Sequence, residues 1–449
     1  MLLKKLYHYG VRGTAYKLFE SYLSGRKQFT KIGNFLSDKA DMLWGVPQGS
    51  VLGPFLFLIF INDLPTSCSL GSWLFADDTV VALSSRNYHD LEIKFNLEVE
   101  KVSKWLLANG LSVHYTNKTK YMLIQSTGQN TVRGNSTNFK LSMGNHQIER
   151  TDRYKYLGII IDNKLNWKLQ IKRVCSKLAS VCGIISKVRH YLDRKSVMLI
   201  YNSLFDSHLR YGLLGWGTAS EDDLRRIRVL QNRAVRFITF SPFFKTSMIP
   251  IYANLRILPL PDLFHLQKAI FMHSIHYGNL PFSLSSYCQC PDHNYSTRYT
   301  ADMNYYLPYI RTNRGQASIK FSGPKVWVNV PNELKQIVFK KPFSKKLKDY
   351  LVGILITKSE NMPQTSYLNK KSGKNTQECF NNLKAIFENE DDENSNFLGF
   401  DICNLETIFA SDDENGDFLG FNVSTPIETL FNTDSENEED FNGFHTYMI

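Results

Sequence analysis

Two adjacent carboxylates, Asp77 and Asp78, are the residues of this chain that most clearly could do chemistry. They lie within residues 74–81, between apolar and β-branched neighbours that favour strands. A tight hairpin would hold both side chains at its tip, where a hydrated divalent cation can reach carboxylate oxygens. The plainer interpretation is a polar hairpin turn. Such turns usually contain Gly or Asn, however, whereas β-branched Thr79 follows directly here.

A loop and a helix must position this pair from upstream. Residues 51–61 are almost all apolar, which predicts a helix that is buried on every side. The small residues at the end of the preceding loop would leave the entrance of that helix open to a ligand. The loop consists of Pro47, Gln48, Gly49 and Ser50.

Together these segments resemble the palm of reverse transcriptases, in particular those of jockey-like non-LTR retrotransposons. The resemblance rests on Pro-Gln-Gly-Ser-Val-Leu-Gly-Pro at residues 47–54 and Phe-Ala-Asp-Asp at 75–78. It implies an RNA-directed DNA polymerase that uses two metal ions, Mg²⁺ or Mn²⁺, with Asp77 and Asp78 as catalytic metal ligands. It also implies that the loop at 47–50 meets substrate and template–primer, that RNA and DNA are partners, and that the protein works in the nucleus and travels through the cytoplasm as a ribonucleoprotein.

Two further motifs of that family are found downstream. Residues 111–121 resemble the next palm motif, which implies a catalytic role for Lys118 near the departing pyrophosphate; the alternative is a solvent-exposed Lys at the start of a strand. Residues 154–162 resemble the hairpin that grips the primer, although their apolar run also suits an ordinary buried strand. The predicted grip consists of Tyr156, Leu157 and Gly158.

One carboxylate of the family is missing from the sequence as it stands. In the family, an Asp on an earlier strand bridges both metal ions, shortly before a segment that resembles residues 1–13 here. We therefore expect a truncated reverse transcriptase that is inactive as this chain alone. The alternative function is a non-catalytic nucleic-acid-binding protein that is tethered to chromatin.

The charge of the chain is distributed very unevenly. The total is +11, but residues 385–449 contain 17 acidic residues and no Lys or Arg, which leaves +28 on the remainder. So basic a body is expected to bind nucleic acid, although a Lys surplus can also serve solubility. Clustering favours directed binding faces, formed by Lys168, Lys172, Arg173, Arg225, Arg226 and Arg228. No apolar run approaches the roughly 18 residues of a membrane-spanning helix.

The predicted fold class is α+β. Helical periodicity predicts a long helix over 88–109 and a helical thumb with three packed helices near 170–191, 194–209 and 220–240. Asp193 and Ser220 are the expected N-caps, and Tyr211 and Trp216 the expected core aromatics. The predicted regions are a partial palm at 1–163, the thumb at 164–241, a mixed region of unassigned role at 242–356, a linker at 357–382 and a disordered acidic tail at 383–449.

The acidic tail contains three repeats in which an acidic run is followed by two Phe residues. Such a segment has too few apolar residues to fold alone. The repeats resemble linear motifs that dock on small helical domains of the transcription factor IIS N-terminal or integrase-binding type, with the Phe rings in apolar pockets and the acids against a basic rim. The alternatives are a solubility tail or a shield for the basic body. The docking residues would be Phe397, Gly399, Phe400, Phe418, Gly420, Phe421, Phe441, Gly443 and Phe444.

Overall fold

The structure is a computed structural model that describes residues 1–361, apart from 43–44, 48, 86, 116–117, 125–138, 242–246, 282–283, 285–286 and 289–303, together with 446–448. The chain divides into two units. The N-terminal unit comprises Met1–Tyr156, Ile161–Leu165 and Val423–Ile449, and the helical unit comprises Leu157–Ile160 and Asn166–Asn422. The described residues combine helices with small sheets, in keeping with the α+β class.

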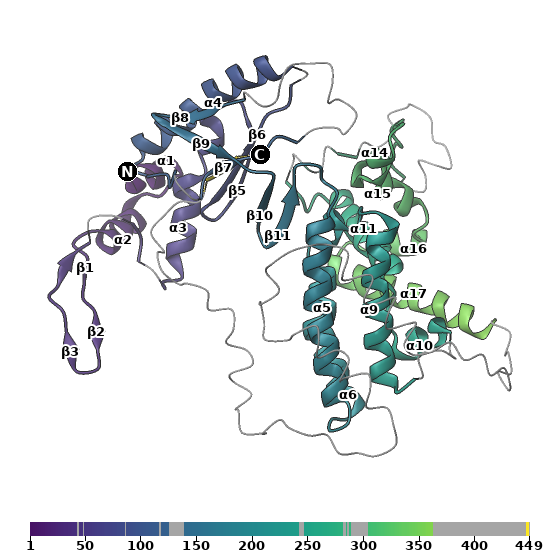
Figure 1. The fold of residues 1–449 in the computed structure, drawn as a ribbon. Helices are drawn as coiled ribbons and strands as arrows, with labels where there is room; N and C mark the ends of the chain where they lie inside the picture. The colour runs from purple at the N-terminus through teal and green to yellow at the C-terminus, as the bar shows by residue number, and fades with distance from the viewer. Residues whose placement is uncertain are drawn as a thin grey trace, which may run out of the picture. The chain divides into compact units, whose positions relative to one another are not determined.

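Strands β5 to β9 of the N-terminal unit are labelled in Figure 1. In the described part of the chain they form the main sheet together with β12, in the order β5-β6-β12-β7-β9-β8. Neighbours β5 and β6, and β8 and β9, are antiparallel, whereas β7 is parallel to β9. Strand β12 fills the position between β6 and β7 and is parallel to both. No strand is predicted at this place from the sequence. The strands are β5 (Gly71–Phe75), β6 (Asp78–Ala82), β7 (Lys120–Tyr121), β8 (Leu141–Met143), β9 (His146–Arg150) and β12 (Thr446–Met448).

Helix α4 (Tyr88–Ala108) packs on this sheet and confirms the helix predicted over 88–109. The side chain of Asn87 caps its first turn by accepting a hydrogen bond from the backbone N–H of His89. The buried face repeats at helical spacing and shares one core with Val81, Tyr121 and Met143 of the sheet. This face consists of Phe95, Val99, Val102 and Leu106.

The remaining elements of the N-terminal unit are short. Two-residue strands pair antiparallel as β1 with β4 and β2 with β3. The elements are α1 (Leu2–His8), α2 (Gly13–Leu23), β1 (Lys27–Gln28), β2 (Lys31–Ile32), β3 (Phe35–Leu36), β4 (Ala40–Asp41), α3 (Leu52–Ile61) and the 3₁₀ helix η1 (Leu64–Ser67).

Helix α3 corrects one prediction, because it is not buried on every side. Leu56 and Ile61 are buried, but the side chains of Phe55 and Leu58 are 57% and 50% exposed. The error arose because an apolar composition identifies a helix without showing how many neighbours cover it. Among the described residues, α3 contacts α1 and packs Ile61 into the core of α4 and the sheet, whereas Leu52, Phe55 and Leu58 stay exposed.

The helical unit contains the three packed helices that the sequence predicted. The second of them passes through a short π-helical segment, η3, and both predicted caps form: Asp193 accepts from the N–H groups of Lys195 and Ser196, and Ser220 from that of Asp223. The helices are α5 (Lys168–Val188), then α6 (Arg194–Ile200) with η3 (Tyr201–Phe205) and α7 (Asp206–Arg210), and α9 (Glu221–Thr239).

The described part of region 242–356 is helical, not mixed as predicted. Its helices share one core with α5 and α9, from Ile171 to Leu355, so no structural boundary falls near 241. The last helix of the described residues ends at Glu360, beyond the predicted start of the linker. None of the helices in the described ranges is long and apolar enough to cross a membrane. The further helices are α8 (Leu213–Trp216), α10 (Met248–Leu255), α11 (Leu260–His276), α14 (Asn313–Ala317), α15 (Ile319–Val328), α16 (Asn332–Lys335) and α17 (Lys340–Glu360).

Candidate functional site

The two carboxylates lie at the tip of a tight hairpin, as predicted. Phe75 of β5 pairs with Asp78 of β6, so Ala76 and Asp77 form a two-residue loop. Ala76 has φ 50°, in the left-handed region that usually requires Gly. Asp77 is exposed and Asp78 is half-buried. The hairpin therefore presents one carboxylate to solvent and holds the other against the protein.

Tyr156 lies close enough to Asp78 for the two to interact electrostatically. Burial raises the pKa of the Tyr156 hydroxyl, and the negative charge of Asp78 raises it further. Tyr156 ends β10 (Arg153–Tyr156), which forms a two-stranded sheet with β11 (Ile159–Asp162). The structure thus brings the first residue of the predicted primer grip beside the carboxylate hairpin.

Leu157 and Gly158 form the turn between β10 and β11. Their φ angles of 46° and 76° are both positive, which is typical of a type I′ hairpin turn. The hydroxyl of Tyr211 donates a hydrogen bond to the carbonyl of Leu157. A Cβ added at Gly158 would lie 3.5 Å from the Tyr211 ring. This aromatic ring therefore packs directly on the turn.

Tyr211 corrects a second prediction. Tyr211 and Trp216 are both predicted to be core aromatics. Trp216 is indeed fully buried, and its indole N–H donates to the carbonyl of Tyr211 at 2.7 Å. Tyr211 itself is 56% exposed, because its ring lies on the turn at 157–158 instead of in the core. The sequence signal that could have identified it is Gly212 directly after it, which has φ 65° and ends the helix.

The predicted template loop is held against the start of α3. Ser50 Oγ donates to the carbonyl of Pro47 at 2.8 Å and accepts from the N–H of Gly53 at 2.9 Å. A Cβ on Gly53 would lie 2.7 Å from that carbonyl, so only Gly fits there. Gly49 has φ 76° and open space around it. Gln48 lies outside the described residues.

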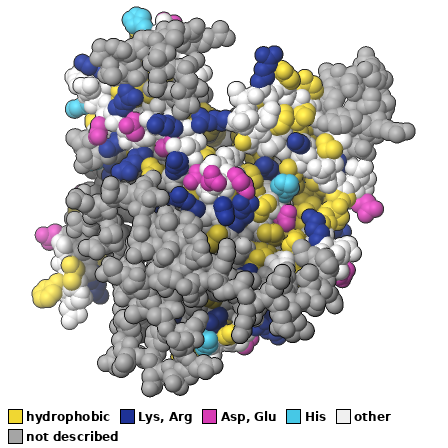
Figure 2. Space-filling model, turned by 45° about the vertical axis from the view of Figure 1, so that its right-hand side comes forward, with side chains coloured by type: hydrophobic (Ala, Val, Ile, Leu, Met, Phe, Trp, Pro, Cys, Tyr) yellow, Lys and Arg dark blue, Asp and Glu magenta, His cyan; other side chains and the backbone are white. Residues whose placement is uncertain are grey.

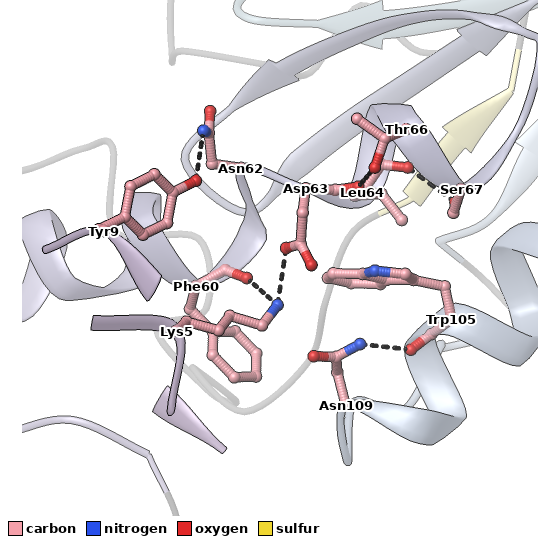
Figure 3. Close-up of polar contacts among 10 residues, drawn as sticks. All are labelled: Lys5, Tyr9, Phe60, Asn62, Asp63, Leu64, Thr66, Ser67, Trp105 and Asn109. Atoms are coloured by element: carbon pink, nitrogen blue, oxygen red, sulfur yellow. Dashed lines mark hydrogen bonds and ion pairs between the residues drawn. The ribbon is translucent and has the colours of Figure 1, made fainter. Parts of the chain in front are cut away.

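A half-buried lysine, Lys5, joins α1 to the end of α3 (Figure 3). Lys5 Nζ donates to the carbonyl of Phe60 at 2.7 Å and to Asp63 Oδ1 at 2.6 Å, and lies 4.6 Å from the ring centroids of Phe60 and Trp105. A cation at this position also complements the C-terminal end of the α3 dipole. Sequence reasoning missed this contact, because one Lys in a short helix carries no pattern of its own.

Lys118 lies in a turn, two residues before β7, and is half-buried. Its carbonyl accepts a hydrogen bond from the Tyr154 hydroxyl at 3.4 Å. This contact ties the predicted palm motif to strand β10. The role of the Lys118 ammonium near a pyrophosphate stays a prediction.

The donor set at the hairpin matches a hard divalent cation only in part. Two carboxylates with water and substrate phosphates are enough to hold one Mg²⁺. Among the described residues, however, no third carboxylate, His or Cys joins Asp77 and Asp78 into a metal-binding group. A pair of ions needs carboxylates from more than one strand. A two-ion site at this hairpin would therefore need a carboxylate besides Asp77 and Asp78.

The predicted basic residues lie on two helices that pack against each other, α5 and α9. Lys168, Lys172, Arg225 and Arg226 are exposed, whereas Arg173 and Arg228 are half-buried and Arg228 pairs with Glu221. Burial raises the pKa of the Cys175 thiol on α5 to about 12, and the positive charge of Arg226 acts against this rise. The face drawn in Figure 2 carries groups of Lys and Arg side chains interrupted by a few acidic ones.

The predicted docking residues of the tail lie outside the described residues.

The segment that carries the hairpin and the loop at 47–50 matches known proteins. Residues 2–161 match the sequence model of the family described as reverse transcriptase (RNA-dependent DNA polymerase). This segment belongs to the reverse transcriptase family.

Curated relatives agree with this assignment. A probable RNA-directed DNA polymerase from transposon X-element of Drosophila melanogaster is 27% identical over 51% of this chain. The RNA-directed DNA polymerase from mobile element jockey of the same species is 27% identical over 55% of the chain, and the probable enzyme from transposon BS is 29% identical over 51%. The matches cover 25%, 27% and 26% of these relatives, so the chain spans about a quarter of their length. The segment is similar to jockey-like non-LTR retrotransposon reverse transcriptases.

Proposed function

We propose that this chain supplies palm and thumb parts of an RNA-directed DNA polymerase of the non-LTR retrotransposon type. The observation that carries the proposal is the Asp77-Asp78 hairpin tip beside Tyr156, within a segment that matches reverse transcriptases. The N-terminal unit would be the palm part, and α5 to α9 the thumb. Asp77 and Asp78 would hold Mg²⁺ or Mn²⁺, which when bound neutralises phosphate charge during nucleotidyl transfer.

In this proposal each group of residues has a separate task. The loop at 47–50 and the turn at 156–158 meet the template–primer, and Tyr211 holds that turn in place. The basic helices α5 and α9 bind phosphates of RNA or DNA and contribute affinity without sequence preference. The described residues contain two carboxylates of a site that needs more, so we expect nucleic-acid binding to be far easier to detect than polymerisation by this chain alone.

Template–primer binding across a salt series tests the thumb assignment. The double variant K168A/K172A removes two exposed cations of α5, and K345A/K346A removes two exposed cations of α17 as a matched control. We expect the slope of log affinity against log salt to fall by about 0.9 for each phosphate that the first variant no longer neutralises. Equal slopes for the two variants would contradict a directed binding face on α5.

Primer extension with Mg²⁺ or Mn²⁺ tests the carboxylates. Extension by this chain should be undetectable or very weak. Any extension should disappear in the D77A and D78A variants, because each would lose a metal ligand. Extension that persists in both would refute the catalytic assignment of the hairpin.

The acidic tail favours a second function, partner docking, through its three repeats of acids followed by paired Phe residues. The tail would bind a helical, basic-rimmed domain and hold the protein at chromatin in the nucleus. One repeat should bind weakly, and three on one chain should raise avidity. Pull-down from nuclear extract compares the wild-type protein with a variant in which all six Phe residues of the pairs are Ala and every acid remains. Equal capture would mean that charge alone recruits the partners.

A further inference from the structure

The helical unit contains an open cavity away from the residues discussed so far. Its volume is about 370 Å³, and it is lined by the end of α9 and the two residues after it, by one side of α10 and by the first residue of α6. Small-ligand sites usually begin at roughly this size, and a single nucleotide would fit within it. Neither the carboxylate hairpin nor the basic residues of α5 and α9 named above line this cavity.

An exposed aromatic ring forms one wall of the cavity. Phe240 follows the last residue of α9 with φ 53°, and its side chain is 58% exposed. The guanidinium carbon of Arg189 lies 4.8 Å from the Phe240 ring centroid and 5.0 Å from that of Phe237. His190 meets the Phe240 ring edge-on at 5.5 Å between centroids. The ring is therefore held by cationic and aromatic neighbours while much of its surface stays open.

The rest of the lining offers hydrogen-bonding groups beside apolar ones. Arg194 donates to the side-chain oxygen of Asn254 at 3.1 Å, which uses one of the five donors of a guanidinium. The hydroxyls of Thr239 and Ser241 lie 2.8 Å apart at the same wall. Ile251 contributes an apolar surface. No residue that lines the cavity in the described chain is acidic.

The nearest acidic residue in sequence is already engaged. Asp193 precedes Arg194, and its carboxylate accepts from the N–H groups of Lys195 and Ser196 as the cap of α6. Asp193 stays negative, but its charge is directed to the cap of its own helix; the charged side chains that line the cavity or contact its Phe240 wall, Arg194 and Arg189, are cationic. A cation beside an open aromatic face suits a ligand that has both a planar ring and a negative charge.

We propose that this cavity binds one nucleotide of a single-stranded nucleic acid, with the base stacked on Phe240 and the phosphate at Arg194. The inference rests on the proposed nucleic-acid-binding function and adds a site that distinguishes single strands from duplex. Stacking on an aromatic ring tolerates any base, because every base has a flat face. A duplex cannot use the site, because its bases are already stacked and paired.

Fluorescence anisotropy of the full chain with labelled hexathymidylate and hexauridylate tests the proposal. The F240L variant keeps an apolar side chain and the same backbone strain but loses the flat ring, and it should weaken single-strand binding about tenfold. F240W should restore it. Y191L is the matched control, because Tyr191 is 89% exposed and does not line the cavity. Binding by Y191L and the thermal melting of all variants should equal those of the wild type.

Several outcomes would overturn the proposal. Equal single-strand binding by F240L and the wild type would overturn it. Single-strand binding by F240W that is as weak as that of F240L would also overturn it. Thymidine monophosphate binding as tightly as the hexamer would show a site for free nucleotides instead of strands. If F240L lost binding to a protein from nuclear extract but kept oligonucleotide binding, the cavity would be assigned to a protein partner. Duplex binding that persists in F240L leaves the basic-helix assignment intact, whereas a wild-type chain that binds neither form refutes both proposals.

Discussion

The two units differ in how they are built and in where they place exposed groups. The helical unit has one continuous core that runs from α5 to α17 and includes Trp216, Tyr201 and Trp327 as fully buried side chains. The N-terminal unit has a smaller core between α4 and strands of two to five residues. It holds the candidate catalytic carboxylates and leaves several large apolar side chains exposed, among them Phe55 and Phe75. The candidate carboxylates thus lie on the unit with the smaller core, which should open locally at lower free energy.

A core substitution in each unit would test this contrast most strongly. W216A removes a fully buried indole together with its hydrogen bond to the Tyr211 carbonyl, and should destabilise the helical unit by about 3–5 kcal/mol. M143A removes a fully buried side chain of the N-terminal unit and should cost about 2–5 kcal/mol there.

Native-state hydrogen exchange, resolved by peptide, measures both effects. Each variant should lose protection mainly in its own unit. If W216A deprotected α4 and β6 as strongly as α5 and α9, the two units would unfold as one, and the contrast drawn from their cores would fail.

The helices could be predicted from the sequence because their signals are local. In α4 the buried residues recur at helical spacing, and in α9 Ser220 stands directly before the first turn and bonds to it. The Asp77-Asp78 hairpin was also predictable, since two short strand-forming runs flank a two-residue loop. Each of these features depends on residues within a few positions of one another.

The missed features all depend on contacts between distant residues. Tyr211 is exposed because it packs on the turn at Leu157, 54 residues away. Lys5 reaches Asp63, 58 residues away, and α3 is open on one side because few described residues cover it. Strand β12 joins β6 across more than 360 residues. A strand's partner and register depend on packing, which no local pattern encodes.

Protonation offers a second test, because the helical unit buries His273 in its core and half-buries His276. Burial lowers the pKa of both below the ordinary 6.5. His273 is fully buried and bonds to the Ile337 carbonyl at 2.6 Å, so its Nε2 carries the proton, while its Nδ1 is buried without a hydrogen-bond partner. A proton added at Nδ1 would place a charge in a buried site that offers it no hydrogen-bond acceptor, near the cation of Lys340.

The sign of the pH effect follows from these lowered pKa values. As pH falls, His273 takes up a proton in the unfolded chain before it does so in the folded chain. The contribution of neutral His273 to folding stability is therefore complete above pH 6.5 and is lost as pH falls from 6.5 toward the folded pKa. The melting temperature of the helical unit should therefore drop over this range. H273Q keeps a donor for the Ile337 carbonyl but does not titrate, and should make the drop shallower. A pH profile identical to that of the wild type would exclude His273 as a contributor.

The smallest expected effect concerns β12, the strand that sequence reasoning could not find. Its residues Thr446, Tyr447 and Met448 pair with Thr79, Val80 and Val81 of β6, and Met448 also pairs with Tyr121 of β7. The Y447P variant removes one backbone N–H and introduces a ring that a central strand does not accommodate. A ladder hydrogen bond is worth about 1 kcal/mol, so amides of β6 and β7 should exchange several-fold faster without it. Peptides of α5 and α9 should keep their protection, which would show that β12 stabilises the sheet that carries Asp78 and not the helical unit. Unchanged hydrogen exchange in β6 would mean that the sheet keeps its stability without the pairing of β12.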